Sequence, residues 1–507
     1  MANPEPMVPV PGQCLSAGAS SAKCLHHLLT RPFSRQATIE KLSDKVLLNI
    51  FCSFLDDSPR DWPTLMHICC KWRNIVFASQ RTLQLRLLLT HGASILKTLD
   101  CWPTLSIDVR YEGSPGLDPP TPEDESNIMA ALKHSDRVTS IWLTVTRSLL
   151  ERVFANEMQF SGLEDLVLLS RDRALLTLPS TFRCGPHLRT LHFTGIAFPA
   201  LPRLLSSSRD LVDIQLHEIP DIGYISPESL RNALSGMSRL RSLSLRFHSL
   251  HSLSAADYIE LYPPSGKHVV LPTLTCLTYQ GTSEYLDSLV ARIDAPSLRD
   301  VAISFFNEFI YNVSNIRQFI NRIEMQKSHR QSDILFSEHS ISISLTQPAP
   351  TCLKLQVLCE QLGQQLYSIA RSCSLLSSFF LCVEDLRIEA TRPLSRQDGT
   401  DSVRWVELIR SFSATKRFHL NGDFATDVFR ALEISGSLHK TVLPALHKLY
   451  IPQPSPRHAP LREAVASLMT SRSLSGHPIA VEYERLCNIS EAHGVGTMFL
   501  SVTTITR

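Results

Sequence analysis

A short apolar pattern recurs along most of the chain, and it constrains the fold more than any other feature. The pattern is apolar-x-x-apolar-x-apolar, and seven clear copies begin at residues 138, 163, 188, 211, 240, 274 and 298. Weaker copies begin at residues 383 and 446. The final apolar-x-apolar part of each copy alternates, which is typical of a strand with one buried face.

The spacing of these copies predicts the architecture. By subtraction, the seven clear copies start 25, 25, 23, 29, 34 and 24 residues apart. Leucine-rich repeats are about 20–29 residues long, so most intervals fit and the longer ones need insertions. Parallel neighbouring strands need a crossover, usually a helix. We therefore predict an α/β fold in which residues 89–483 form an irregular leucine-rich-repeat solenoid of parallel strands with helical crossovers.

Several segments between the copies carry helix-start signals. Thr121-Pro122 and Ser226-Pro227 each place a capping hydroxyl before a first-turn proline, and Ser283 precedes a segment with helical apolar spacing. The repeat blurs between residues 325 and 380, although residues 340–345 and 353–357 alternate as strands do. We expect the repeats to continue there with insertions; a separate C-terminal domain is the alternative.

A different pattern occupies residues 39–88. Apolar residues recur at three- and four-residue steps over residues 42–55 and again over 62–76, which predicts two amphipathic helices. Ser43 and Asp44 lie where the N-cap of the first helix is expected. So many apolar side chains exceed what one small core can bury, so some of them face a partner or the rest of the chain. The pattern alone leaves a partner-binding module and an N-terminal cap of the repeats equally open.

Two segments of this helical module resemble the F-box motif. Residues 42–51 read LSDKVLLNIF, and residues 67–75 read HICCKWRNI. The family motif opens with Leu-Pro-x-x-(Ile/Val/Leu)-Leu-x-x-Ile-Phe and carries Val-Cys-(Lys/Arg)-x-Trp further on. This chain has Ser43 in place of the usual proline, and Cys70 shifts the basic residue to Lys71.

Further segments are similar to a large family of F-box proteins from mushroom-forming fungi. These segments are residues 77–79, 97–103, 284–286, 292–296 and 474–481. The resemblance spans residues 39–483. It leaves out residues 1–38, which we expect to be a disordered tail, and residues 484–507, which we expect to be a C-terminal tail.

The resemblance implies a substrate-recognition subunit of an SCF-type, cullin-based ubiquitin ligase. In this family the F-box binds the S-phase kinase-associated adaptor protein, which joins it to the cullin, and the repeats bind the protein substrate. The candidate adaptor-binding residues are Leu42, Val46, Leu47, Ile50, Phe51, Ile68, Trp72 and Ile75. For each of them a role in the core of the module is equally open. The alternative function is a leucine-rich-repeat interaction scaffold that is not associated with a ubiquitin ligase.

Composition and motifs narrow the remaining function classes. Lys plus Arg is 50 and Asp plus Glu is 48, and this net charge of +2 argues against a nucleic-acid partner. No apolar run reaches the length of a membrane span. The 13 cysteines include no C-x-x-C pair, and no nucleotide-binding, zinc-hydrolase or serine-hydrolase motif occurs. We therefore expect no enzymatic activity, metal or cofactor, and a cytoplasmic or nuclear location.

Overall fold

The chain folds into two compact units, the first ending at Leu85 and the second beginning at Arg86. The computed structural model describes residues 42–58, 61–91, 96–111, 121–154, 158–170, 176–248, 268–306, 314–322, 330–346, 352–359, 362–391, 402–422, 424–436, 442–452 and 459–484. The predicted boundary between residues 88 and 89 falls inside the first strand of the second unit. The predicted tail 1–38 and residues 485–507 of the other predicted tail lie outside the described residues.

The described part of the first unit is helical. Its helices are α2 (Asp44–Asp57), α3 (Trp62–Ile68) and α4 (Cys70–Ala78). The predicted N-cap of α2 is confirmed, because the Ser43 hydroxyl accepts a hydrogen bond from the Val46 amide at 3.4 Å. A serine therefore supplies the helix start that a proline supplies by its fixed backbone angle.

One face of each helix meets the others in a small apolar core. The buried side chains are Leu47, Phe51, Leu55, Trp62, Leu65, Trp72, Ile75 and Val76. The rings of Phe51 on α2 and Trp72 on α4 lie at the centre of these contacts, with their centroids 4.7 Å apart. This aromatic pair joins the two longer helices of the unit.

The second unit is built on one sheet of sixteen described strands. In order of neighbours they are β1 (Arg86–Leu89), β2 (Ser106–Tyr111), β3 (Val138–Val145), β5 (Asp165–Ser170), β8 (Thr190–Thr194), β10 (Asp213–Ile219), β11 (Ser242–Phe247), β13 (Cys276–Gly281), β15 (Asp300–Phe305), β18 (Cys352–Leu358), β17 (Ser340–Thr346), β16 (Gln331–Phe336), β19 (Asp385–Ala390), β20 (Arg417–Asn421), β21 (Lys448–Pro452) and β22 (Ala480–Glu484). Three short parallel pairs lie outside it: β4 (Gln159–Phe160) with β7 (Arg183–Cys184), β6 (Leu176–Thr177) with β9 (Ile196–Ala197), and β12 (Val269–Val270) with β14 (Ile293–Asp294).

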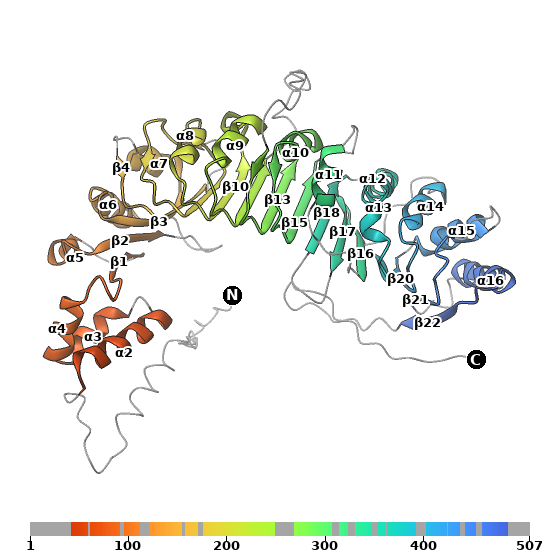
Figure 1. The fold of residues 1–507 in the computed structure, drawn as a ribbon, viewed down its shortest axis with the longest axis horizontal. Coiled ribbons are helices and arrows are strands. Elements are labelled where there is room, and N and C mark those ends of the chain that lie inside the picture. Colours follow the sequence, from red (N-terminus) through yellow and green to blue (C-terminus); the bar gives the residue numbers. More distant parts are fainter. Residues whose placement is uncertain are drawn as a thin grey trace, which may run out of the picture. The chain divides into compact units, whose positions relative to one another are not determined.

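Helices connect many of these strands and lie along one side of the sheet (Figure 1). They are α5 (Leu96–Cys101), α6 (Pro122–Leu132), α7 (Arg147–Phe154), α8 (Leu201–Ser207), η2 (Asp221–Gly223), α9 (Pro227–Leu234), α10 (Ser283–Val290), α11 (Ser314–Arg322), α12 (Leu362–Leu375), α13 (Ser377–Phe380), α14 (Ser402–Arg410), α15 (Ala425–Gly436) and α16 (Ala459–Leu474). The predicted caps at Thr121 and Ser226 are confirmed, since each hydroxyl accepts a hydrogen bond from an amide three residues on. At α10 the cap is Thr282, one residue before the predicted start at Ser283.

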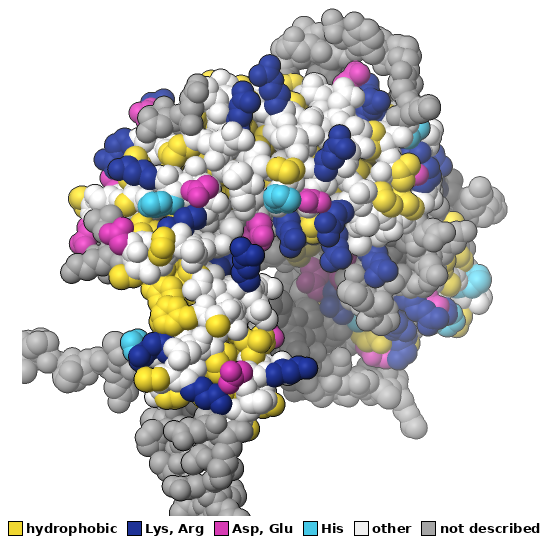
Figure 2. All heavy atoms as spheres, turned by 60° about the vertical axis from the view of Figure 1, so that its left-hand side comes forward, with side chains coloured by type: hydrophobic (Ala, Val, Ile, Leu, Met, Phe, Trp, Pro, Cys, Tyr) yellow, Lys and Arg dark blue, Asp and Glu magenta, His cyan; other side chains and the backbone are white. Residues whose placement is uncertain are grey.

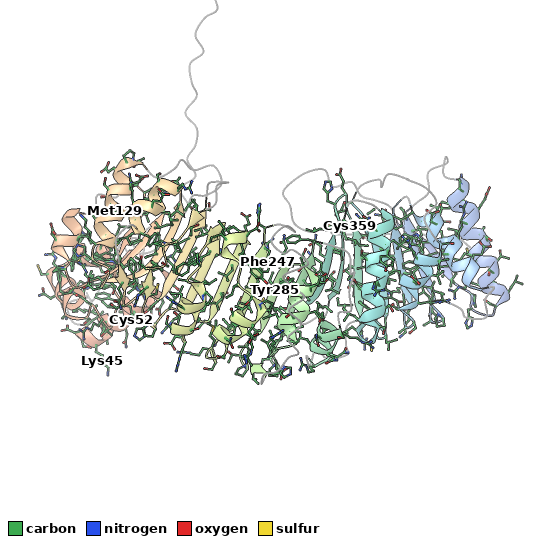
Figure 3. All side chains as sticks on the ribbon, turned by 90° about the horizontal axis from the view of Figure 1, so that it is seen from above. Lys45, Cys52, Met129, Phe247, Tyr285 and Cys359 are labelled. Carbon is green, nitrogen blue, oxygen red and sulfur yellow. The ribbon has the colours of Figure 1, made fainter. Side chains whose placement is uncertain are left out.

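The core of the second unit lies between the sheet and its helices. The central apolar residue of each copy is in register with the next, as in the ladder Leu166, Leu191, Ile214, Leu243, Leu277 and Val301. All six are buried. Bulky aromatic residues fill wider spaces between the sheet and the helices. The ring centroids of Phe247 on β11 and Tyr285 on α10, for example, lie 4.8 Å apart (Figure 3). The prediction of a mixed α/β fold with a large parallel sheet and helical crossovers is therefore confirmed.

The prediction of parallel strands is wrong at one strand, β17. It runs antiparallel to both of its neighbours, β16 and β18. The link between β16 and β17 is only residues 337–339, and a parallel crossover needs a dozen or more residues. The chain thus leaves β15, forms β16 three places further along the sheet, and returns through β17 to set β18 beside β15. Helix α12 then leads to β19, which pairs with β16.

Candidate functional site

The eight predicted adaptor-binding residues separate into two groups in the first unit. Leu47, Phe51, Trp72 and Ile75 are at most 8% exposed and belong to the core described above. Leu42, Val46, Ile50 and Ile68 are between 37% and 50% exposed. The four buried residues therefore belong to the core of the unit, and the four exposed residues lie on its surface. We call the four exposed residues the apolar stripe.

Two members of the apolar stripe lie on one face of α2, and a third lies just before this helix. Val46 and Ile50 are four residues apart in α2, which places them one turn apart on the same face, and Leu42 directly precedes the N-cap Ser43. The core residues Leu47 and Phe51 are each one position further on and face the other helices. Helix α2 is therefore apolar on two sides, and only one of them is covered within the described part of the unit.

The start of α4 is tied to the start of α2 by Lys71. Its ammonium donates a hydrogen bond to the Leu42 carbonyl oxygen at 2.7 Å and lies 3.4 Å from an Asp44 carboxylate oxygen. This contact joins the first turn of α4, three residues after Ile68, to the N-terminal end of α2. The apolar stripe thus draws on two segments that are far apart in the sequence.

The sequence prediction passed over one exposed aromatic residue. Phe77, near the end of α4, is 44% exposed. It lies in the segment 77–79, which resembles the fungal family. The helical apolar spacing ends at residue 76, so the sequence pattern does not indicate that Phe77 is exposed.

The sheet offers a second candidate surface on the side away from its helices. Side chains that alternate with the buried rows point to this side, and we call it the polar face. Near its centre His217 lies 2.8 Å from the Ser244 hydroxyl, between Nε2 and Oγ, and its ring centroid is 5.1 Å from that of His192. Burial, the neighbouring His192 and the charge of Arg246 lower the pKa of His217 to about 4. Burial also lowers the pKa of His192.

Charged residues of the polar face are paired with one another toward both ends of the sheet. Arg86 lies 3.4 Å from a carboxylate oxygen of Asp108 on the next strand. At the other end, Asp385 accepts from Arg417 at 3.0 Å and lies 3.2 Å from His419. Burial raises the pKa of Asp385, but the hydrogen bonds and positive charges of His419 and Arg417 outweigh it and leave the pKa below its usual value. Figure 2 shows acidic and basic side chains intermingled over the surface turned toward the viewer.

The described part of either surface shows no cluster of metal-ligating side chains. Within the described residues, no three His, Cys, Asp or Glu side chains come together as ligands for a metal ion. Across the same residues, no helix has both the length and the apolar character needed to cross a membrane.

Comparison with known proteins leaves the family of this chain open. No protein-family model matches the chain, and no curated protein matches it. Among solved structures, the chain is similar to the leucine-rich repeat-containing protein LegL7 from Legionella pneumophila, at 15% sequence identity. The match covers 70% of this chain and 95% of that chain with a TM-score of 0.26. We draw no functional argument from a likeness at this level.

Proposed function

We propose that this chain is a non-catalytic substrate-recognition subunit of an SCF-type, cullin-based ubiquitin ligase, working in the cytoplasm or nucleus. In this proposal the first unit binds the S-phase kinase-associated adaptor and the second unit binds the protein substrate. The observation that carries it is the apolar stripe on the helices whose sequence resembles the F-box motif. Leu42, Val46, Ile50 and Ile68 are large, apolar and exposed, which is costly in water unless a partner covers them.

The buried half of the predicted residues has a supporting part in this proposal. Leu47, Phe51, Trp72 and Ile75 hold the helices in place, so that the apolar stripe is presented as one rigid surface. Rigid presentation favours binding because little conformational entropy is lost on association. We therefore assign direct adaptor contact to the exposed four and not to the buried four.

The second unit supports a role in capturing a protein. Its polar face carries hydroxyl, amide, imidazole and charged groups in rows about 4.8 Å apart, which suits many weak, directional contacts with a partner surface. Tethering a substrate close to a ubiquitin-charged enzyme raises the effective concentration of the substrate's lysines there. This role needs no reactive centre on the chain itself.

Co-purification of the full-length chain with purified adaptor tests the proposal. The variant Val46→Asp with Ile50→Asp places two charges in the apolar stripe and leaves the core untouched. We expect it to lose the adaptor, since each charge would be buried without a partner in the complex. The matched control is Asn74→Asp with Ala78→Asp, two exposed positions also four residues apart, on α4.

The two variants separate the proposal from its alternative. The control is expected to retain the adaptor, and circular dichroism is expected to match the wild-type chain for both variants. Adaptor retained by the folded stripe variant refutes the assigned contact surface. A folded wild-type chain that never binds the adaptor refutes the ubiquitin-ligase role and leaves the interaction scaffold, which the polar face supports by itself.

A further inference from the structure

Three arginines stand in one row at the edge where the central strands of the sheet begin. Main-chain hydrogen bonds define the row: the amide of Val212 donates to the Arg189 carbonyl, and the amide of Arg241 donates to the Val212 carbonyl, each at 2.8 Å. The amides of Thr275 and Arg299 continue it at 2.8 and 2.9 Å. Arg189, Val212, Arg241, Thr275 and Arg299 are therefore equivalent positions, each directly before the first residue of β8, β10, β11, β13 or β15. We call the three arginines the arginine rim.

The arginine rim is exposed, and the acid next in its row is paired elsewhere: the amide of Arg189 donates to the Glu164 carbonyl at 2.7 Å, and the Glu164 carboxylate lies 3.5 Å from Arg86. Arg189, Arg241 and Arg299 are all exposed. Within the described residues, none of their guanidinium groups makes an ion pair or hydrogen bond with a carboxylate. Asp210, on a loop at this edge, lies 3.2 Å from Arg239 and is already neutralised.

Further along the sheet, acidic and basic residues at the equivalent positions alternate and pair with one another, unlike the arginines of the rim. There the backbone ladder runs through Arg330, Glu384 and Lys416, so that an acid lies between two bases. Lys416 donates to a Glu384 carboxylate oxygen at 3.0 Å. The hydrogen bond with Lys416 and the positive charges around it lower the pKa of Glu384, although burial opposes them. At the arginine rim the intervening positions are instead the uncharged Val212 and Thr275.

The spacing of the arginine rim is regular. Arg189 and Arg241 are two strands apart, and so are Arg241 and Arg299. Neighbouring strands are about 4.8 Å apart, so the Cα atoms of successive rim arginines lie about 10 Å apart along the row. An α-helix rises about 1.5 Å per residue, so positions seven residues apart are about 10.5 Å apart and lie on nearly the same face.

We propose that the arginine rim binds an acidic segment of the partner protein, a helix whose carboxylates recur about every seventh residue. This inference deepens the proposed role of the second unit in binding a protein and rests on that role. A guanidinium group accepts a carboxylate through two parallel hydrogen bonds, so each contact fixes both position and orientation. The rim therefore selects the charge pattern of a substrate, while the polar face contacts the rest of its surface.

The neighbouring aspartates favour an acidic protein over a nucleic acid. Asp213 and Asp300 follow the row by one residue and lie at the same edge of the polar face. A phosphate backbone carries a charge about every 3.4 Å along each strand and would also meet these carboxylates. A helix with separate acidic positions reaches the three arginines and leaves the aspartates facing uncharged residues.

Fluorescence anisotropy with the full-length chain tests the proposal. The probe is a labelled helical peptide about three heptads long with glutamate at every seventh position. The variant carries Arg189→Gln, Arg241→Gln and Arg299→Gln. We expect its affinity for the peptide to fall by about tenfold, since each of three exposed ion pairs contributes a few-fold. We also expect the wild-type affinity to fall as salt is raised.

The control variant removes the same three charges elsewhere on the second unit. It carries Arg371→Gln, Arg410→Gln and Arg430→Gln, which are exposed positions on α12, α14 and α15. Unchanged peptide affinity in this control supports the proposal. An equal loss in the control, or no loss in the rim variant, overturns it.

Two further arms test the spacing and the partner class. Equal binding of a peptide with the same composition but adjacent glutamates overturns the spacing. Tighter, rim-dependent binding of a single-stranded oligonucleotide overturns the choice of a protein partner. The adaptor test gives a separate result. A rim variant that binds the adaptor but not the peptide leaves the proposed function of the first unit intact. A chain that binds the peptide but not the adaptor leaves the proposal for the arginine rim intact.

Discussion

Phe51 and Val46 lie on different faces of α2, and truncating each of them to alanine tests the division of the first unit into core and apolar stripe. Phe51 is 0% exposed and its ring is 4.7 Å from that of Trp72. Replacing a buried phenylalanine by alanine costs about 3–5 kcal/mol of folding free energy, and part of this is the lost aromatic pair. A unit of this size has only a few kcal/mol of stability, so Phe51→Ala is expected to unfold it.

Val46→Ala is expected to have a much smaller effect. The change removes two methyl-sized groups, worth about 1.6 kcal/mol when fully buried. Val46 is 44% exposed, so the loss is at most about 0.9 kcal/mol. The two variants therefore differ by at least about 2 kcal/mol, or roughly thirtyfold in the equilibrium between closed and open forms.

Hydrogen exchange read by mass spectrometry on the full-length chain measures both effects locally. We expect Phe51→Ala to abolish protection of the amides in α2 and α4 and to leave the central strands β8–β15 protected. Val46→Ala is expected to keep most of the wild-type protection. Equal loss of protection in the two variants, or none in Phe51→Ala, would refute the assignment of core and surface.

Three other substitutions test packing and charge in the second unit. An alanine Cβ at Gly185 would lie 2.1 Å from the Ser161 carbonyl oxygen, so Gly185→Ala is expected to cost about 1–3 kcal/mol and lower the thermal unfolding midpoint. Arg472 is buried and donates to the carbonyls of residues 442 and 443, so Arg472→Ala is expected to cost about 1–3 kcal/mol, seen as faster amide exchange in β21 and α16. The pKa of His217 is lowered in the folded chain, so as the pH falls the unfolded chain takes up a proton at this residue before the folded chain does. The contribution of His217 to the free energy of unfolding is therefore full above about pH 6.5 and is lost toward pH 4. His217→Gln is expected to flatten this pH dependence in denaturant titrations.

Each of these outcomes has a clear opposite. A Gly185→Ala chain with an unchanged midpoint would mean that the local backbone relaxes freely. Unaltered exchange in Arg472→Ala would show that water replaces the guanidinium at no cost. A pH slope that persists in His217→Gln would assign the proton uptake to another group.

Most of the sheet could be predicted from the alternation of apolar residues. The closing apolar-x-apolar part of each of the nine copies lies on a strand, because a half-buried strand must alternate and a stacked strand must repeat its buried row. The reversed segment could not be predicted in the same way. The alternation of Ile341 and Ile343 identifies a strand but carries no direction. The direction of β17 depends on β16. The sequence pattern does not identify β16 as a strand, because a buried serine, Ser332, interrupts its row of buried apolar residues.

The candidate sites were harder to predict than the fold. Helix α2 carries apolar residues on two faces, and the sequence alone does not say which face meets α4. The Phe51–Trp72 contact decides it and leaves Val46 and Ile50 exposed. The arginine rim is visible in sequence only as an arginine after the first leucine of three copies. Its meaning depends on which carboxylates lie within reach, and that is a property of the fold.

The most direct test of the central claim is hydrogen exchange of the full-length chain with and without the purified adaptor. The claim that the apolar stripe is the adaptor-binding surface predicts slower exchange in α2 and at the junction of α3 and α4. It predicts little change in the strands of the second unit. Exchange that stays unchanged in α2 at saturating adaptor, or protection confined to the sheet, would contradict it.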